Sequence, residues 1–178
     1  MTDFQRTAFI LGGARSGKTR FAQSLVENRR GRWVYLATAE QRGDAEMATR
    51  IEAHRAERSE RWTTVEEPVG LPAALLRCGR DDIVLVDCLT LWLSNLLEQD
   101  RDVGASSAAL VSALAGTPAS VVLVSNEVGE GIVPANALAR RFRDAAGRLH
   151  QSVAAAVDDV FLIKAGLPLR LKPSNESH

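Results

Sequence analysis

One run of residues near the start of the sequence carries the clearest chemistry. It matches the phosphate-loop pattern G-x-x-x-x-G-K-[ST] at every fixed position, with Gly12, Gly13, Ala14, Arg15, Ser16, Gly17, Lys18 and Thr19. In such a loop successive backbone N–H groups point at phosphate oxygens, and the following helix N-terminus adds a partial positive charge. The Lys18 ammonium can reach the β- and γ-phosphates, and the Thr19 hydroxyl can ligate Mg²⁺. The alternative is a glycine-rich turn with a chance lysine, which random sequence of this length gives about once in a hundred chains. We therefore expect nucleoside triphosphate binding.

Asp87 is a second candidate, because it closes the apolar run Ile83-Val84-Leu85-Val86. A carboxylate in that place would hold Mg²⁺, directly or through water, opposite Thr19. The alternative is a strand-end acid that caps the next helix. We favour the metal role because the sequence also contains a phosphate loop.

His54 is a third candidate, on a helix predicted over 44–58. Met47, Ile51 and His54 share one face of that helix, and this pattern alone is typical of a satisfied core histidine. The surrounding arginines suit an anionic ligand instead, and they are Arg50, Arg55, Arg58 and Arg61. A neutral imidazole is also a competent nucleophile toward phosphorus.

Glu66 and Glu67 follow an extended segment that begins at Trp62. A carboxylate in this place could accept hydrogen bonds from guanine N1–H and the 2-amino group, which adenine does not offer. The alternative is a pair of surface acids, and the residues alone favour that alternative.

The elements that must position these residues alternate between strand and helix. Strands are expected at 8–11, 32–37, 62–67, 83–88, 120–125, 159–164 and 167–171, and helices at 18–28, 44–58, 71–77, 89–97, 105–114 and 136–157. This order predicts a P-loop NTPase-type α/β domain, RecA-like, whose mostly parallel sheet is flanked by helices. The carboxyl edge of that sheet, where ligands bind, would carry the phosphate loop, Thr38, Asp87 and Asn126-Glu127. On the helix at 136–157 the buried stripe is expected to be Leu138, Phe142, Ala145, Leu149 and Val153.

Length and composition bound the remaining possibilities. The 178 residues suit a single domain, 1–178, with 173–178 as a frayed tail. The sequence has 22 lysine and arginine residues and 22 aspartate and glutamate residues, so its formal net charge is zero. A protein that binds nucleic acid or a membrane surface would need an excess of basic residues. Cys78 and Cys88 fit no zinc or redox spacing, and the N-terminus lacks an apolar signal core. We expect a soluble, cytoplasmic protein.

Several segments beyond the phosphate loop resemble one family. They are Tyr-Leu-Ala-Thr-Ala from Tyr35, Arg-Ile-Glu-Ala-His-Arg from Arg50, Trp-Thr-Thr-Val-Glu-Glu-Pro from Trp62, Val-Asp-Cys-Leu-Thr-Leu-Trp-Leu from Val86, Ser-Asn-Glu-Val-Gly-Glu-Gly-Ile-Val-Pro from Ser125 and Phe-Arg-Asp-Ala-Ala-Gly-Arg from Phe142. Together they resemble the bifunctional adenosylcobinamide kinase / adenosylcobinamide-phosphate guanylyltransferase family of cobalamin biosynthesis, from about Phe9 to Lys172.

The resemblance implies two reactions. A nucleoside triphosphate, ATP or GTP, phosphorylates the hydroxyl of adenosylcobinamide; GTP then gives GMP to adenosylcobinamide-phosphate, through GMP carried on a histidine that matches His54. Some members have a second histidine before it, where this chain has Ala53. The matching nucleotide contacts beyond the phosphate loop are Ala37, Thr38, Ala39, Arg55, Ala56, Glu57, Arg58, Glu66 and Asp87. The resemblance also implies a homotrimer.

Two other functions remain open from the residues. A monofunctional small-molecule kinase would use the phosphate loop alone, without a covalent intermediate. A DNA-stimulated ATPase motor would need a basic groove with aromatic side chains, against which zero net charge and 5% aromatic residues count.

Overall fold

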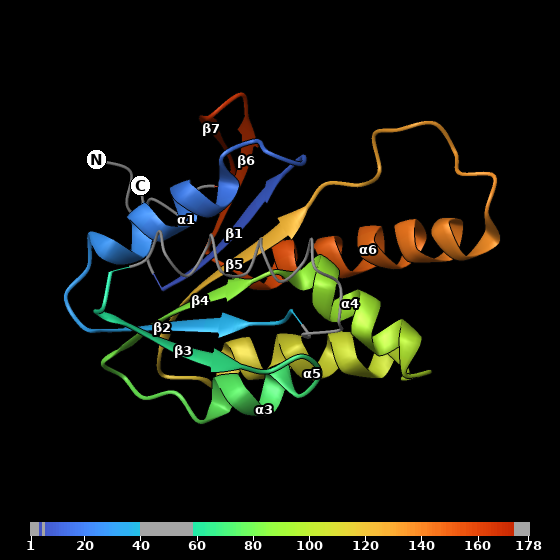
Figure 1. Ribbon diagram of the computed structural model, residues 1–178. Coiled ribbons are helices and arrows are strands. Elements are labelled where there is room, and N and C mark those ends of the chain that lie inside the picture. Colours follow the sequence, from blue (N-terminus) through green and yellow to red (C-terminus); the bar gives the residue numbers. More distant parts are fainter. Residues whose placement is uncertain (1–3, 5, 40–58, 173–178) are drawn as a thin grey trace.

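The chain forms a mostly parallel sheet with helices on both of its faces (Figure 1). The computed structural model describes residues 4, 6–39 and 59–172. Its strands are β1 (Thr7–Gly12), β2 (Arg32–Ala37), β3 (Trp62–Glu66), β4 (Asp82–Asp87), β5 (Ser120–Asn126), β6 (Asp159–Lys164) and β7 (Leu167–Lys172). Its helices are α1 (Lys18–Glu27), α3 (Leu71–Leu76), α4 (Leu89–Glu98), α5 (Val103–Gly116) and α6 (Ala137–Ala156).

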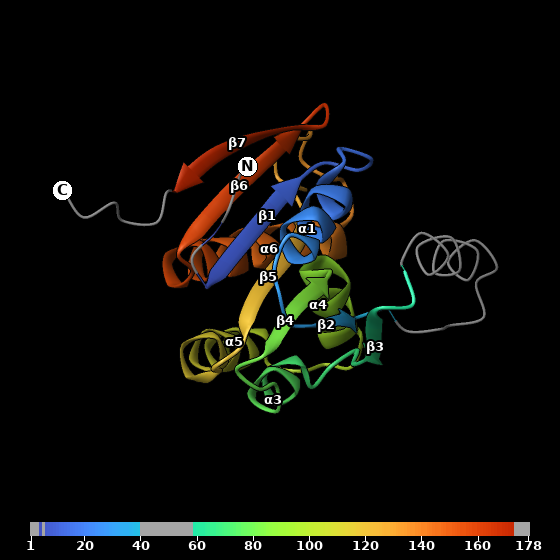
Figure 2. The ribbon, with the colours of Figure 1, turned by 90° about the vertical axis from the view of Figure 1, so that its left-hand side faces the viewer.

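The order of the strands places β1 and β4, with β5 between them, in the interior of the sheet. The order is β3-β2-β4-β5-β1-β6-β7, and every neighbouring pair is parallel except β6 and β7. Figure 2 shows the β6–β7 hairpin at one edge of the sheet and β3 at the other. The P-loop NTPase-type α/β fold expected from the sequence is thereby confirmed, with β7 as an antiparallel addition.

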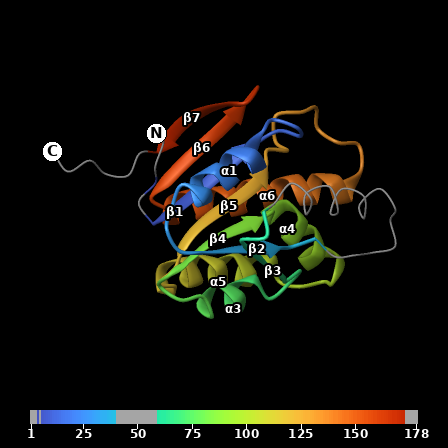
Figure 3. The same ribbon diagram turned by 60° about the vertical axis from the view of Figure 1, so that its left-hand side comes forward.

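Continuous apolar runs explain why the interior strands are buried on both faces. All six residues of β1 are buried, as are Val121, Val122, Leu123 and Val124 of β5. One face packs against α1 through Ala22, Leu25 and Val26, and the opposite face packs against α3, α4, α5 and α6. Figure 3 shows α1 on one side of the strands and α3 and α5 on the other.

The long helix α6 differs from the expectation at its beginning. Asn136 is the N-cap, and its side chain accepts hydrogen bonds from the N–H groups of Leu138 and Ala139. Leu138 was predicted in the buried stripe, but its side chain is 63% exposed, and Phe142 is only half-buried. The buried residues of α6 begin at Ala145. The loop after β5 runs away from the sheet, so the first turns of α6 lie beyond the sheet and only the later turns pack against it (Figure 1).

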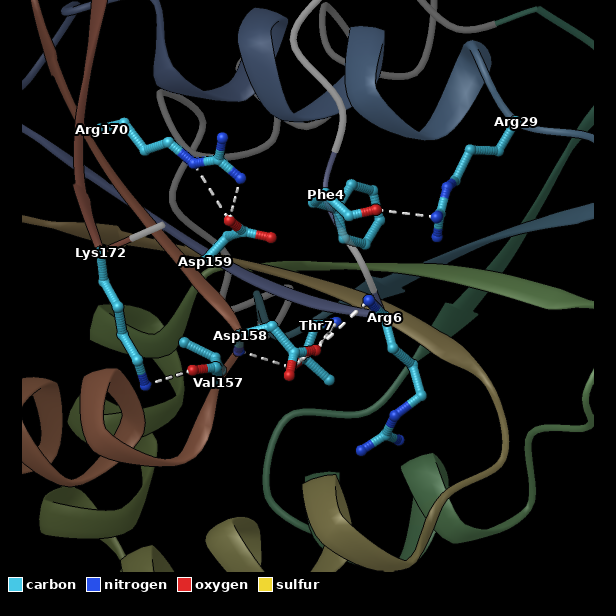
Figure 4. Close-up of polar contacts among 9 residues, drawn as sticks. All are labelled: Phe4, Arg6, Thr7, Arg29, Val157, Asp158, Asp159, Arg170 and Lys172. Carbon is cyan, nitrogen blue, oxygen red and sulfur yellow. Dashed lines mark hydrogen bonds and ion pairs between the residues drawn. The ribbon is translucent and has the colours of Figure 1, made fainter. Parts of the chain in front are cut away.

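A group of polar contacts joins the elements at the end of the sheet where β1 and β6 begin (Figure 4). The Asp158 carboxylate accepts hydrogen bonds from the N–H and the hydroxyl of Thr7, each at 2.8 Å. Arg170 of β7 pairs with Asp159 of β6, and the Lys172 ammonium donates to the carbonyl of Val157 at the end of α6. These contacts hold β1, β6, β7 and α6 in a fixed relation. In the part of the chain that the structure describes, no helix is long and apolar enough to cross a membrane.

Candidate active site

The phosphate loop joins the end of β1 to the first turn of α1. Gly17 is the N-cap of α1 with a φ of 92°, a left-handed conformation that favours glycine. Since glycine has no side chain, none caps the first N–H groups of α1, which leaves them for an anion. The sequence-predicted strand, loop and helix are therefore arranged as phosphate binding requires.

Neighbouring backbone holds this loop on two sides. The N–H of Glu127, just after β5, donates to the carbonyl of Gly12 at 3.0 Å. The N–H of Gly166, in the turn between β6 and β7, donates to the carbonyl of Ser16 at 2.9 Å. The β6–β7 hairpin thus supports the loop at one end while the contacts of Figure 4 fasten the strands at the other.

Two of the loop glycines are under different constraints. A Cβ on Gly12 would lie 2.5 Å from Ser16 Oγ and 2.8 Å from the carbonyl oxygen of Ile163. A Cβ on Gly13 would meet nothing within 4 Å among the described residues. Gly12 is therefore required by close packing of the loop, whereas Gly13 is not.

Lys18 lies over the loop, with its side chain mostly buried. The ammonium donates to the carbonyl of Gly13 at 3.1 Å. Burial lowers the pKa of Lys18, while the nearby Asp87 carboxylate opposes that shift. An ammonium held beside the loop in this way is placed to meet phosphate oxygens that bind there.

Asp87 ends β4 opposite the start of α1. Its Oδ2 accepts a hydrogen bond from Thr19 Oγ1 at 3.2 Å and another from the Tyr35 hydroxyl at 3.0 Å. A hydroxyl and a carboxylate facing each other are the hard oxygen ligands that Mg²⁺ prefers alongside phosphates and water. Within the described ranges no cluster of three or more His, Cys, Asp or Glu forms a metal site made of protein ligands alone. The pair therefore fits a metal that is held partly by a nucleotide.

The next stretch of the carboxyl edge is fixed by a buried polar network. The Thr38 side chain is fully buried, and its hydroxyl accepts from the N–H of Cys88 at 2.8 Å. Asn95 of α4 donates to the carbonyls of Thr38 and Pro68 at 2.8 and 2.9 Å. Any nucleotide contact of the segment Ala37, Thr38 and Ala39 must therefore come from backbone or from the two flanking, partly exposed alanines.

Glu66 and Glu67 lie in different surroundings. Glu67 Oε1 accepts a hydrogen bond from the N–H of Gly70, the residue before α3, at 2.7 Å, and Arg77 Nη2 lies 3.9 Å from Glu67 Oε2. Glu66 ends β3, pairs in register with Ala37 and is exposed at the same edge of the sheet as the loop. Because Glu66 is exposed at the carboxyl edge, a ligand bound there could reach its carboxylate, and its role in recognising a base stays a prediction.

The carboxyl ends of the parallel strands place four groups of predicted residues along the same edge of the sheet: Gly12 to Thr19, Ala37 to Ala39, Glu66 and Asp87. His54, Arg55, Ala56, Glu57 and Arg58 lie outside the described residues, so their assignment stays a prediction.

Sequence reasoning missed two pairs of side chains, one at the carboxyl edge and one in the core. One is Tyr35 with Asp87, which share a face of the sheet because Ala37 and Asp87 are paired in register. The other is Ser125, whose hydroxyl lies 2.8 Å from His150 Nε2 in the core beside Phe9. Burial lowers the pKa of His150. Alternation along 32–37 indicates which residues share a face with Tyr35, but the register that makes the contact is not readable from the sequence.

The fold and this site define the chain as a P-loop nucleoside triphosphate-binding protein. The family model described as "Cobinamide kinase / cobinamide phosphate guanyltransferase" matches residues 8–171. The chain belongs to this family.

Two relatives agree with that assignment, and a solved structure shows the same fold. The bifunctional adenosylcobalamin biosynthesis protein CobP of Pseudomonas aeruginosa is 47% identical over 168 residues, 92% of this chain and 95% of that protein. The bifunctional adenosylcobalamin biosynthesis protein CobU of Escherichia coli is 41% identical, over 92% of this chain and 98% of that protein. A prototypical ATPase from the type III secretion system of pathogenic bacteria is similar in structure, with a TM-score of 0.59 and 12% identity over 94% of this chain and 57% of that one. At that identity the likeness shows the fold alone.

Proposed function

We propose that the chain phosphorylates adenosylcobinamide with a nucleoside triphosphate and then transfers GMP from GTP to adenosylcobinamide-phosphate. The observation that carries the proposal is the phosphate loop with Lys18, Thr19 and Asp87, in a chain that the family model matches over residues 8–171. Both reactions attack a phosphorus atom of a bound triphosphate, so both need a site that positions phosphates and neutralises their charge.

In the first reaction the hydroxyl of the substrate attacks the γ-phosphorus. The bond from that phosphorus to the β–γ bridging oxygen breaks, a nucleoside diphosphate leaves, and the hydroxyl proton is released. The N–H groups of the loop and the Lys18 ammonium orient the phosphates for this step and stabilise the charge on the leaving oxygen. Mg²⁺, held by Thr19 and Asp87, would neutralise phosphate charge when bound.

In the second reaction His54 attacks the α-phosphorus of GTP and pyrophosphate leaves. A phosphate oxygen of adenosylcobinamide-phosphate then attacks the same phosphorus, which releases the imidazole and gives adenosylcobinamide-GDP. The histidine divides one displacement into two. The arginines that follow His54 in the sequence would stabilise the charge on the attacked phosphate. One nucleotide site would serve both reactions, with His54 acting in the second.

Guanine selectivity would come from Glu66. A carboxylate accepts hydrogen bonds from guanine N1–H and the 2-amino group together, whereas adenine has no donors in that arrangement. The greater exposure of Glu66 at the carboxyl edge supports this choice between the two acids. We further propose a cytoplasmic homotrimer that binds neither nucleic acid nor membrane, and light scattering after gel filtration tests the trimer.

Covalent labelling tests the proposal most simply. The protein is incubated with GTP labelled at the α-phosphorus, and the label should stay on the chain through a bond that is labile in acid and stable in base. His54→Ala should carry no label. Phosphorylation of adenosylcobinamide without any label on the wild-type chain would instead indicate a kinase that uses the phosphate loop alone.

A further inference from the structure

Tyr35 contacts the candidate metal pair, Thr19 and Asp87, at Asp87, and the functions above give it no role. Its hydroxyl donates to Asp87 Oδ2 at 3.0 Å, and Thr19 Oγ1 donates to the same oxygen at 3.2 Å. A carboxylate is broadly free to rotate about its last torsion. Two donors on one oxygen, from β2 and α1, hold that rotation in a single orientation.

The Tyr35 ring is itself held in place. Its side chain is buried, and its ring packs edge-on against Trp62 with centroids 6.2 Å apart at 83°. Trp62 Nε1 donates to Glu27 Oε1 of α1 at 3.1 Å. A series of contacts therefore runs from α1 through Trp62 and Tyr35 to Asp87 and back to α1 at Thr19. Such an arrangement suits a hydroxyl that must stay in one position.

We propose that Tyr35 is a positioning residue that orients the Asp87 carboxylate toward the divalent cation bound with the nucleotide. It acts through Asp87 and does not touch the cation or the phosphates. Hydrogen bonds from outside the ligand shell orient metal ligands and tune metal affinity, and losing one such partner typically costs about 10- to 100-fold in affinity. The inference rests on the proposed function only for the need for Mg²⁺.

A purely structural role makes a different prediction. Tyr35 would then be a core tyrosine whose hydroxyl is satisfied by the nearest acceptor, and removing the hydroxyl would change stability alone. Mg²⁺ dependence therefore separates the two roles.

The test uses Tyr35→Phe, which keeps the ring and removes the hydroxyl. A fluorescent GTP analogue carrying an N-methylanthraniloyl group is titrated into the protein in EDTA and at a series of Mg²⁺ concentrations. We expect the affinity of Tyr35→Phe for the nucleotide in EDTA to equal that of the wild type. The Mg²⁺ concentration that gives half of the Mg²⁺-dependent gain in affinity should rise about 10-fold in the variant. The matched control is Trp33→Phe, because Trp33 packs in the same aromatic cluster, 5.6 Å from Trp62, and donates to the carbonyl of Arg29. Trp33→Phe should leave the Mg²⁺ dependence unchanged.

A double-mutant cycle shows whether Tyr35 acts through Asp87. In an Asp87→Asn background, Tyr35→Phe should add no further change in Mg²⁺ dependence. Wild-type Mg²⁺ dependence in the folded Tyr35→Phe variant, or an equal additional change in the Asp87→Asn background, overturns the inference. These titrations need no cobinamide, so failure of the proposed reactions in the wild-type enzyme is a separate result.

Discussion

Replacing Gly12 with alanine should weaken both the fold and nucleotide binding. The added Cβ would lie 2.5 Å from Ser16 Oγ and 2.8 Å from the carbonyl oxygen of Ile163, inside the about 3.5 Å at which heavy atoms normally pack. The serine hydroxyl can rotate, but the Ile163 carbonyl belongs to the backbone of β6, and Ile163 lies opposite Gly12 in the parallel pairing of β1 with β6. Relief therefore requires the two strands to move apart at the loop.

The size of the effect follows from that geometry. Overpacking of a well-packed site costs typically 1–3 kcal/mol, so we expect the free energy of unfolding to fall by about 2 kcal/mol. With a urea dependence of about 2 kcal/mol per molar, the unfolding midpoint drops by about 1 M. A loop displaced by even part of an ångström misplaces its N–H groups, so nucleotide affinity should fall by up to about 100-fold.

Gly13→Ala is the matched control for stability. Gly13 does not adopt a positive φ, and its Cβ would meet nothing within 4 Å. Its urea midpoint should therefore stay within about 0.3 M of the wild-type value, corresponding to about 0.5 kcal/mol. Equal midpoints for Gly12→Ala and the wild type, or an equal loss in both variants, would refute the reasoning.

Three further predictions concern stability and selectivity. Burial lowers the pKa of His150, so the unfolded chain binds the proton more tightly; the free energy of unfolding should fall as the pH drops below about 6.5, and His150→Gln should reduce that slope in urea melts between pH 5 and 7. A steeper slope in the variant contradicts this. Asp158→Ala removes the acceptor of both Thr7 hydrogen bonds and should lower the free energy of unfolding by about 2–3 kcal/mol, with nucleotide affinity unchanged; a loss under 0.5 kcal/mol counts against the contacts of Figure 4. Glu66→Gln should lower the preference for GTP over ATP in binding titrations. Glu67→Ala removes the acceptor of the Gly70 N–H and should lower thermal stability without changing that preference, and the reverse pattern would exchange their roles.

Short sequence patterns predicted the phosphate loop and the interior strands, because the residues that define each of them are close together in the sequence. The phosphate loop is a contiguous motif, and the interior strands are continuous apolar runs, so both followed from short segments. Leu138 was predicted wrongly because helical periodicity identifies a face but not where along the helix the sheet ends. The hydroxyl of Tyr35 and the imidazole of His150 were missed for a related reason, since each contact depends on how separate elements pack.

The central claim is that one chain carries out two successive reactions, with the phosphate loop serving both and His54 serving the second. The most direct measurement follows adenosylcobinamide through both steps, with GTP and Mg²⁺, in the wild type, Lys18→Met and His54→Ala. We predict adenosylcobinamide-GDP from the wild type, neither product from Lys18→Met, and accumulation of adenosylcobinamide-phosphate from His54→Ala. Formation of adenosylcobinamide-GDP by His54→Ala at the wild-type rate would contradict the account.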